Sequence, residues 1–322
     1  MKKKVLYGWC ALFAACALLL TGCAAESAEN RNVTPAPEVP ENLARDGNGV
    51  PLLAVYHVDE DTVYEMSVEA YLAGVLAGEM RSDWPMEALK AQAILARTFV
   101  MKFCTDKKSK YEGADISTDV EEAQAYDATG VNERIEQAVK ETEGLVLSNH
   151  GELPYAWFHA HSGGMTALAG EGLGWDKAEP DYTQNVPGEE SEQAPEEAAA
   201  WQILFAEKAF LQAAERCGVQ AEKLESVSVG QRGPSGRATT ILINGQSVDA
   251  AELRLALGST QMRSTLLESL RIENGGVRMA GKGYGHGVGM PQWGAYAMAE
   301  KGKTAEEIVT YYFRNVTVEK IW

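Results

Sequence analysis

Apolar and polar positions repeat with two different periods along the chain, and from residue 51 onward this pattern predicts a mixture of strands and helices. A period of two indicates a strand, and a period near 3.6 indicates a helix. The predicted strands and hairpins are LLAVYHV (52–58), TVYEMSV (62–68), a hairpin over 145–160 with LVLS and LPYAWFHA on either side of Asn149-His150-Gly151, a hairpin over 226–245 turned at Gly233-Pro234-Ser235-Gly236, and a last strand at 316–321. The predicted helices are 68–80, 85–103, 131–142, 201–217, 249–257, 291–300 and 304–313. Because the strands come mostly as hairpins, we expect an α+β fold with mostly antiparallel sheet, forming a two-lobed domain with a central cleft.

The first predicted helix carries a carboxyl group on its apolar stripe. The stripe consists of Val68, Tyr71, Leu72, Val75 and Leu76. Glu79 follows Val68 by eleven residues, which returns it to nearly the same angle around the helix. A carboxyl group there loses hydration, so we expect its pKa to rise toward a value useful for a general acid. The alternative is a Glu in the last helical turn that simply extends into water.

The next helix begins after Trp84-Pro85 and has two cations on one flank of its apolar seam. The seam consists of Met86, Leu89, Ala93, Ala96, Val100 and Phe103. Lys90 and Arg97 are seven residues apart and therefore share a flank. If that flank faces Glu79, the two cations could bind an anionic substrate. If not, their aliphatic stems cover the edge of the core.

Glycine occupies every second position from 281 to 289. In an extended chain one face would be bare backbone, open to close approach, and the other would show Lys282, Tyr284, His286 and Val288. The spacing is wrong for a dinucleotide-binding loop. The embedded side chains favour a substrate-lining segment over a flexible linker.

A second segment, His159-Ala160-His161-Ser162-Gly163-Gly164, allows three interpretations. The two histidines alternate onto one strand face, as a metal pair would, but no third or fourth ligand is evident in the sequence. Ser162 follows a histidine, yet the strand-turn-helix elbow of a G-x-S-x-G nucleophile is missing. We therefore favour a glycine-hinged loop that shapes a cleft.

The N-terminus has the architecture of a secretory signal. KKK at 2–4 precedes an apolar run over 5–20, and Leu20-Thr21-Gly22-Cys23 resembles the bacterial lipobox, whose cysteine is acylated. We expect residues 1–22 to be a lipoprotein signal peptide, with an uncleaved transmembrane anchor as the alternative. Either way the remainder lies outside the cytoplasm, held at the outer face of the cytoplasmic membrane. Residues 23–50 would be the lipidated Cys23 and a disordered tether, 51–322 the folded domain, and 187–200 an acidic surface excursion within it.

Charge and cysteine content narrow the choice of partner and compartment. Over 322 residues, 29 Lys and Arg face 46 Asp and Glu, a net charge of −17. Such a chain lacks the basic field that nucleic-acid binding requires, so we expect no nucleic-acid partner. The expected folded domain, 51–322, has two cysteines, Cys104 and Cys217. They could form one disulfide or stay as two thiols.

Four ordered blocks together resemble the stage II sporulation protein D family. They are GEM-x-x-x-WP-x-EALKAQAILARTF (78–99), AQAY (123–126), FHAHSGGMT (158–166) and GYGHGVGMPQWGAYAMA (283–299). The resemblance covers about residues 50–322 and implies a peptidoglycan lytic transglycosylase that cuts glycan strands from which amidases have removed the peptides. It also implies an N-acetylmuramoyl-L-alanine amidase as partner, Glu79 as catalytic acid/base, and Lys90 and Arg97 as functional basic positions. From these blocks the expected substrate-binding residues are Lys90, Gln92, Arg97, Tyr126, Ser162, Gly163, Gly164, Tyr284, His286 and Gln292.

The chain departs from the family pattern at its possible metal site. Some members bind zinc through His and Cys near the Ser-Gly-Gly block, but here only His159 and His161 are present. We therefore expect no required cofactor, and these two histidines are weak candidates for a structural zinc.

Two alternatives to a transglycosylase remain. Relatives in the broader family act as amidase enhancers, so the chain could be a non-catalytic lipoprotein that binds glycan or activates an amidase. It could also be a hydrolase with Asp115 or Asp119 as a second carboxylate, because hydrolytic glycosidases usually use two.

Overall fold

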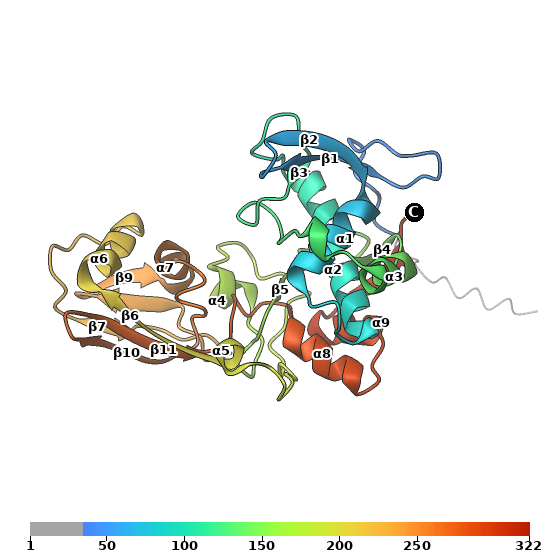
Figure 1. Ribbon diagram of the computed structural model, residues 1–322. Coiled ribbons are helices and arrows are strands. Elements are labelled where there is room, and N and C mark those ends of the chain that lie inside the picture. The colour runs from blue at the N-terminus through green and yellow to red at the C-terminus, as the bar shows by residue number, and fades with distance from the viewer. Residues whose placement is uncertain (1–34) are drawn as a thin grey trace, which may run out of the picture. The chain divides into compact units, whose positions relative to one another are not determined.

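A computed structural model describes residues 35–322, and these residues form an α+β fold of helices and small sheets (Figure 1). The helices are α1 Val68–Glu79, α2 Met86–Asp106, the 3₁₀ turn η1 Ala128–Gly130, α3 Glu133–Glu141, α4 Ala169–Leu173, α5 Glu196–Ala199, α6 Glu207–Arg216, α7 Ala250–Leu257, α8 Gln292–Glu300 and α9 Ala305–Tyr312. The strands are β1 Leu52–His57, β2 Thr62–Ser67, β3 Ile116–Ser117, β4 Leu145–Ser148, β5 Phe158–His159, β6 Ala200–Ala206, β7 Val227–Val229, β8 Thr240–Ile243, β9 Gln246–Asp249, β10 Leu267–Glu273, β11 Gly276–Lys282, β12 Met290–Pro291 and β13 Thr317–Lys320. The predicted signal peptide, Cys23 and the first part of the tether lie outside the described residues.

The strand pairing is mostly antiparallel, as the sequence predicted. The sheets have the orders β2-β1-β3, β10-β11-β6, β7-β8-β9, β13-β4 and β12-β5. Only the short pairs β1–β3 and β5–β12 are parallel among the described strands. The hairpin predicted over 226–245 is present as β7–β8, and its turn is closed by a hydrogen bond from the Gly233 amide to the Arg237 carbonyl (2.9 Å). The α+β prediction is confirmed. The two-lobed arrangement stays a prediction.

Helices α1 and α2 pack through the apolar faces that their periodicity predicted. Ser67 caps α1 by accepting a hydrogen bond from the Ala70 amide at 3.1 Å. The predicted stripe of α1 is fully buried, and α2 lies among α1, α3, α8 and α9 (Figure 1). This cluster of helices forms most of the first hydrophobic core, so the last residue of α1 is held against a rigid support.

Two predicted elements are wrong. Residues 145–160 contain the predicted turn, where Asn149 and Glu152 exchange backbone hydrogen bonds, but the two segments do not continue as a hairpin. Instead β4 pairs with β13 near the C-terminus, and β5 pairs with β12. Residues 201–217 are not one helix, because 200–206 form β6, whose alternate residues Trp201 and Phe205 are buried, and only 207–216 are helical. In both places long-range pairing decides the structure, and local periodicity does not report it.

The described residues contain two large hydrophobic cores. The first draws on residues 39–182 and again on 290–313, whereas the second comes entirely from 201–279. In the second core, α6 and α7 pack together and α6 contacts β6 and β11 (Figure 1). The chain therefore leaves the first core, builds the second, and returns through the glycine-rich segment 283–289.

Two boundary predictions need correction. Val39 and Leu43 are buried in the first core, and Arg45 bridges to Pro51, so the fold begins inside the stretch that we assigned to the tether. The segment 187–200 is not only a surface excursion, because Glu190 points inward to Ser162. Charged carboxylates inside a fold need partners, and Glu190 has them.

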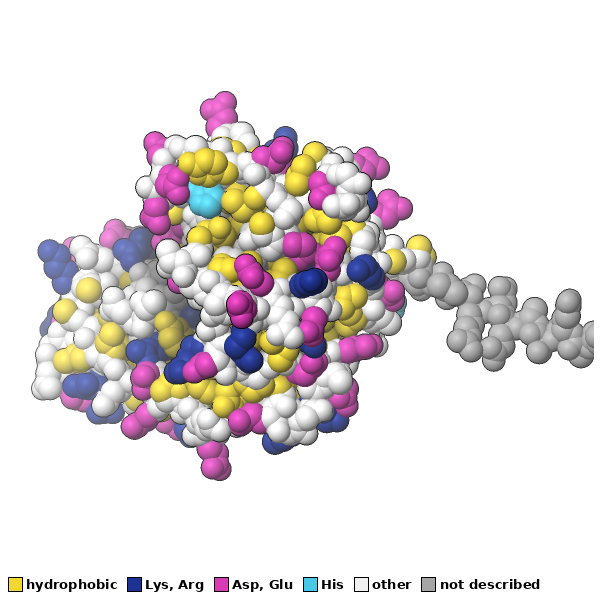
Figure 2. All heavy atoms as spheres, turned by 45° about the vertical axis from the view of Figure 1, so that its right-hand side comes forward, with side chains coloured by type: hydrophobic (Ala, Val, Ile, Leu, Met, Phe, Trp, Pro, Cys, Tyr) yellow, Lys and Arg dark blue, Asp and Glu magenta, His cyan; other side chains and the backbone are white. Residues whose placement is uncertain are grey.

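Cys104 and Cys217 are both free thiols, so the disulfide alternative is wrong. Cys104 is buried in the first core and Cys217 packs against the second. None of the helices between residues 35 and 322 is long and apolar enough to cross a membrane. Acidic side chains are spread over the face shown in Figure 2, in keeping with the net charge of −17.

Candidate functional site

Glu79 opens into a cavity of about 380 Å³ that brings together segments far apart in the sequence. The lining comes from the end of α1, from α2, from the loop before η1, from β5 and its neighbours, and from the segment that leads into α8. The lining residues are Glu79, Phe99, Val120, Ala123, Gln124, Ala156, Trp157, Phe158, His159, Ala160, Tyr284, Gly285, His286 and Gln292. We call this cavity the Glu79 pocket. It matches the expected form of a ligand site, mostly apolar with a few converging polar groups.

The carboxyl group of Glu79 is held by two neutral donors and no cation. The Ala125 amide donates to Oε1 at 2.8 Å, and Gln292 Nε2 donates to Oε2 at 3.3 Å. Burial raises the pKa of Glu79, and the two hydrogen bonds oppose this rise without cancelling it. The raised pKa that the helical stripe predicted is thus present, and the protonated acid is favoured relative to an exposed Glu.

The loop that holds Glu79 also supplies polar atoms without partners. Gln124 is buried and lines the Glu79 pocket, yet neither its Oε1 nor its Nε2 has a hydrogen-bond partner in the described structure. Buried polar groups are normally paired, so such an amide is suited to a ligand that brings its own polar groups. Sequence reasoning missed Gln124, although it lies in the AQAY block between two alanines.

Tyr126 has a different place from the one predicted. Its ring packs over Gly74 of α1, where an added Cβ would come within 2.3 Å of it, and it contacts Tyr71 and His57. Tyr126 does not line the Glu79 pocket. It holds the 123–127 loop against α1 so that the Ala125 amide can reach Glu79.

Two uncharged histidines line the Glu79 pocket. The rings of His159 and His286 lie 5.5 Å apart. Burial, with the nearby Arg254 and Arg237 charges, lowers the pKa of His286 to about 3, and burial lowers the pKa of His159 well below its usual range. His159 Nδ1 faces the Val288 carbonyl at 3.2 Å, which makes it the donor and leaves Nε2 as an acceptor without a partner. Both rings therefore act as neutral hydrogen-bonding groups.

The glycine-rich segment lines the Glu79 pocket as predicted, but its backbone is not extended. Gly283, Gly285, Gly287 and Gly289 all have φ between +72° and +112°. At Gly285 an added Cβ would lie 2.5 Å from the Cβ of His159. The bare face is therefore packed against protein, and Tyr284 and His286 are the side chains that reach the pocket.

The Ser-Gly-Gly block forms a supporting loop outside the pocket. Ser162 is fully buried; its amide donates to Glu190 Oε1 at 2.7 Å, and its hydroxyl bonds the same oxygen. The buried guanidinium of Arg237 donates to the Ser162 carbonyl at 2.6 Å. Ser162, Gly163 and Gly164 all lie outside the lining of the Glu79 pocket, and their contact with substrate stays a prediction. Glu190 and Arg237 were missed because nothing in their local sequence marks them.

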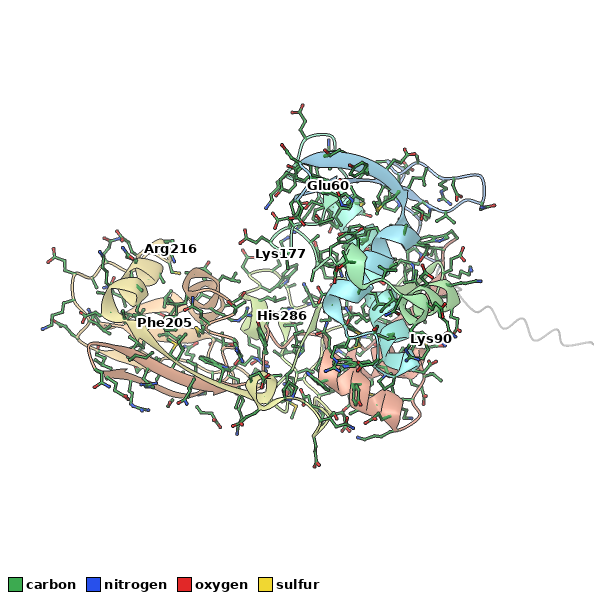
Figure 3. The ribbon with its side chains drawn as sticks, in the orientation of Figure 1. Glu60, Lys90, Lys177, Phe205, Arg216 and His286 are labelled. Carbon is green, nitrogen blue, oxygen red and sulfur yellow. The ribbon has the colours of Figure 1, made fainter. Side chains whose placement is uncertain are left out.

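The predicted cation pair on α2 does not face Glu79. Arg97 has no exposed surface and donates to both carboxylate oxygens of Glu69, at 3.0 and 2.6 Å. Lys90 pairs with Glu87 at 2.8 Å and Glu141 at 2.5 Å, and Figure 3 shows it well away from His286. The shared flank of α2 faces α3 and the start of α1, so the interpretation that it faces Glu79 is wrong. Lys90 and Arg97 both lie outside the pocket lining.

Gln92 is a further correction. Its side chain is fully buried in α2 and does not line the Glu79 pocket. Of the ten predicted substrate-binding residues, the structure therefore brings Tyr284, His286 and Gln292 to Glu79.

The donor set around the Ser-Gly-Gly block does not fit a zinc ion. His161 Nδ1 accepts from the Gly163 amide at 2.9 Å, whereas His159 faces Val288 and His286. The two histidines thus point to different neighbours. Within residues 35–322 no group of three or more His, Cys, Asp or Glu is arranged to hold a metal.

No second carboxylate reaches the pocket among the described residues. Asp115 accepts from the Ala54 amide at 2.9 Å, and Lys110 with other hydrogen bonds lowers the pKa of Asp119 to about 2. Neither residue lines the Glu79 pocket, where Glu79 is the only acid. The two predicted partners for a hydrolytic mechanism are therefore structural.

Comparison with known proteins matches two parts of the chain to family models. Residues 56–149 match "Stage II sporulation protein", and residues 197–289 match a domain of unknown function. The first match contains Glu79 and Gln124, and the second covers the second core and the glycine-rich segment.

Relatives align with most of the chain. The stage II sporulation protein D of Bacillus subtilis is 30% identical over 89% of this chain and 83% of its own length. An uncharacterised protein of Brachyspira hyodysenteriae is 31% identical over 80% of this chain and 67% of its own. The amidase enhancer of Bacillus subtilis is 27% identical over 77% of this chain and 40% of its own. With the family model, these alignments show that the chain belongs to the stage II sporulation protein D family.

Proposed function

We propose that this protein is a lytic transglycosylase that cleaves the MurNAc–GlcNAc bond of peptide-stripped peptidoglycan strands, with Glu79 as acid and then base. Membership of the stage II sporulation protein D family supports a function in sporulation or in the cell wall. The observation that carries the finer proposal is that Glu79, with its raised pKa, is the only acid among residues 35–322 that lines its pocket.

A single carboxyl group is sufficient because the substrate supplies the nucleophile. Protonated Glu79 gives its proton to the glycosidic oxygen as the bond from that oxygen to C1 of the muramic residue breaks. The carboxylate then takes the proton of the C6 hydroxyl as the C6 oxygen bonds to C1, which leaves a 1,6-anhydro end and a free GlcNAc hydroxyl. No water is consumed and Glu79 ends protonated. The intramolecular attack has the proximity advantage built into the sugar.

The surroundings of Glu79 suit both halves of this cycle. Burial favours the acid needed at the start. The Ala125 amide and the Gln292 amide then stabilise the carboxylate that forms when the proton leaves. Gln124 and the free Nε2 of His159 offer hydrogen bonds to sugar hydroxyl and acetamido groups.

A hydrolytic glycosidase is less well supported. Inverting and retaining enzymes place two carboxyl groups about 5 to 9.5 Å apart on either side of the bond. The described lining of the Glu79 pocket supplies only one.

We further propose that the chain works outside the cytoplasm, attached through lipid on Cys23, beside an amidase that strips the peptides. The lipobox sequence supports the anchor. The similarity to an amidase enhancer supports the amidase as partner. No cofactor is needed for the chemistry described above.

One observation favours a second candidate function. The 27% identity with the Bacillus subtilis amidase enhancer is compatible with a protein that stimulates an amidase without cutting glycan. In that case Glu79 would serve only to shape the pocket.

Mass spectrometry of glycan strands tests the proposal. Peptide-stripped strands are incubated with the purified protein and with Glu79→Gln, which keeps the size and acceptor oxygen of the side chain but cannot give a proton. We expect 1,6-anhydro-muramic ends from the wild type, and a loss of rate of about 10³-fold in the variant.

Asp115→Asn and Asp119→Asn are the matched controls, because they remove the carboxylates that a hydrolase would need. Both should cleave like the wild type. Product ends that carry added water, and that disappear in either control, would contradict the transglycosylase. A Glu79→Gln variant that still stimulates the amidase, with no cleavage by the wild type, would establish the second candidate instead.

A further inference from the structure

A second cavity, of about 390 Å³, adjoins the Glu79 pocket. It is lined by Phe99, Lys102, Phe103, Asp106, Lys107, Tyr155, Trp157, Trp175, Asp176 and Lys177. Phe99 and Trp157 line both cavities, so the two lie next to each other. We call the second cavity the aromatic–lysine groove.

Aromatic rings form the walls of the groove. Tyr155 and Trp157 are stacked with ring centres 5.2 Å apart, and Trp175 meets their edges at 5.4 and 5.5 Å. All three rings, with Phe99, are only partly buried. Partly exposed aromatic rings joined to a catalytic pocket provide flat apolar surfaces with polar groups around them, which is how ligand sites are usually built.

Each of three lysines lies over an aromatic ring that lines the groove. Lys102 lies over Tyr155 at 5.1 Å from the ring centre, Lys107 over Phe103 at 5.9 Å, and Lys177 over Trp175 at 5.3 Å. Lys102 also pairs with Asp106 at 3.2 Å. Lys107 and Lys177 are exposed and form no ion pair within residues 35–322.

The aromatic–lysine groove has more lysines than aspartates in its lining. Asp106 accepts from Lys102 and from the Tyr155 hydroxyl at 2.7 Å, so it is already satisfied. Asp176 is exposed. Three lysines against two aspartates make the groove locally cationic on a chain whose net charge is −17 and whose acids are spread over the face seen in Figure 2.

The Glu79 pocket itself cannot supply this charge. Among the described residues that line it, none is Lys or Arg. The adjoining groove offers exposed lysines to an anionic strand that approaches this acidic protein. Figure 3 shows Lys177 between the labelled His286 and the top of the molecule, whereas Lys90 lies to one side.

We infer that the aromatic–lysine groove is a glycan subsite that recognises the lactyl carboxylates of peptide-stripped muramic residues, through Lys107 and Lys177, while its rings pack against the sugar faces. Peptide removal converts each lactyl amide into a free carboxylate, so a stripped strand carries a regular negative charge that an intact strand lacks. The inference rests on the proposed function and names the part of the site that selects the substrate.

Binding to a non-cleaving protein tests this. Glu79→Gln is titrated with muramic-acid-containing oligosaccharides prepared from stripped strands, and with the same oligosaccharides after their lactyl carboxylates are converted to methylamides. Adding Lys107→Ala and Lys177→Ala together should weaken binding of the carboxylate form about tenfold and leave the methylamide form unchanged, since two exposed ion pairs are lost. The difference should shrink with added salt.

Lys108→Ala, made in the same background, is the matched control, because Lys108 is an exposed neighbour that does not line the groove. It should bind both oligosaccharides like its parent. Trp175→Ala should weaken both forms alike, which reports the aromatic wall. Equal binding of the carboxylate form by the double-lysine variant and the Lys108→Ala control would overturn the inference. Because binding is measured without cleavage, an absence of wild-type activity would count against the proposed function and leave this result readable.

Discussion

Helix α1 carries a glutamate at each end, and the two carboxyl groups have different hydrogen-bond partners. At its start, Glu69 is neutralised by the buried Arg97 and also accepts from the Gly144 amide at 3.2 Å. At its end, Glu79 meets only neutral donors, and burial raises its pKa. The first arrangement ties α1 to α2 and to the start of β4. The second leaves a proton available in a pocket.

This difference separates a carboxylate that holds the fold together from a carboxyl group that faces a pocket. A carboxylate with a bidentate guanidinium partner spends its hydrogen-bonding capacity on the fold. A carboxyl group without a cation keeps its proton more readily, and such perturbed groups concentrate at functional sites. The same substitution at both ends should therefore have opposite consequences.

Glu69→Gln should lower the free energy of unfolding by about 3 kcal/mol, because it leaves the fully buried Arg97 charge with only carbonyl acceptors. Glu79→Gln should cost no stability at neutral pH. Urea unfolding of the two variants measures both effects, and Glu65→Gln, on an exposed strand position, is the control. Equal losses at 69 and 79 would remove the distinction between the two ends.

The stability of the wild type relative to Glu79→Gln should depend on pH. The raised pKa of Glu79 means that, as pH rises above the ordinary value of 4.5, the unfolded chain releases this proton while the folded chain keeps it. Wild-type stability therefore falls with pH over that window, until the folded carboxyl group also ionises. The melting temperature of Glu79→Gln relative to the wild type should rise across the same window.

Cleavage should follow the same proton. Activity should persist to higher pH than an ordinary Glu would allow, and then fall as Glu79 loses its proton. A melting difference that stays constant or decreases between pH 4 and 8 would show that the pKa of Glu79 is not raised.

The smallest effect should come from Gln292→Ala. Its amide lowers the pKa of Glu79, so its removal should move the alkaline limit of activity to higher pH and change the maximal rate by about fivefold or less. A pH–rate profile measures the shift. Gln193→Ala, which removes a surface glutamine bonded to Tyr296, should leave the profile in place. A shift to lower pH would contradict the assigned hydrogen bond.

Local periodicity was sufficient to place Glu79. The apolar stripe of α1 is a property of one helix, so its angle could be worked out from spacing alone. The same reasoning failed for Arg97, because spacing puts Lys90 and Arg97 on one flank but cannot say which neighbour that flank meets. The neighbour turned out to be Glu69.

Other parts of the site depended on pairings that local sequence does not report. Trp157 reaches the pocket beside β5, which pairs with β12, and Gln124 reaches it because Tyr126 holds its loop against α1. The period-two pattern of Trp201, Ile203 and Phe205 was present in the sequence, but short apolar runs fit a helix or a strand equally well. Residues 200–206 form a strand because β6 pairs with β11, which in turn pairs with β10.

The arrangement of the two cores has a consequence for the order of folding. All buried residues of the second core come from residues 201–279, so this core can condense as soon as that stretch of chain has been made. The first core needs residues 290–313, and β4 needs β13, which follows it by about 170 residues. Such long loop closures slow folding. Glu79 therefore receives Gln292 and His286 late, and the nascent chain has no assembled pocket until most of it has been synthesised.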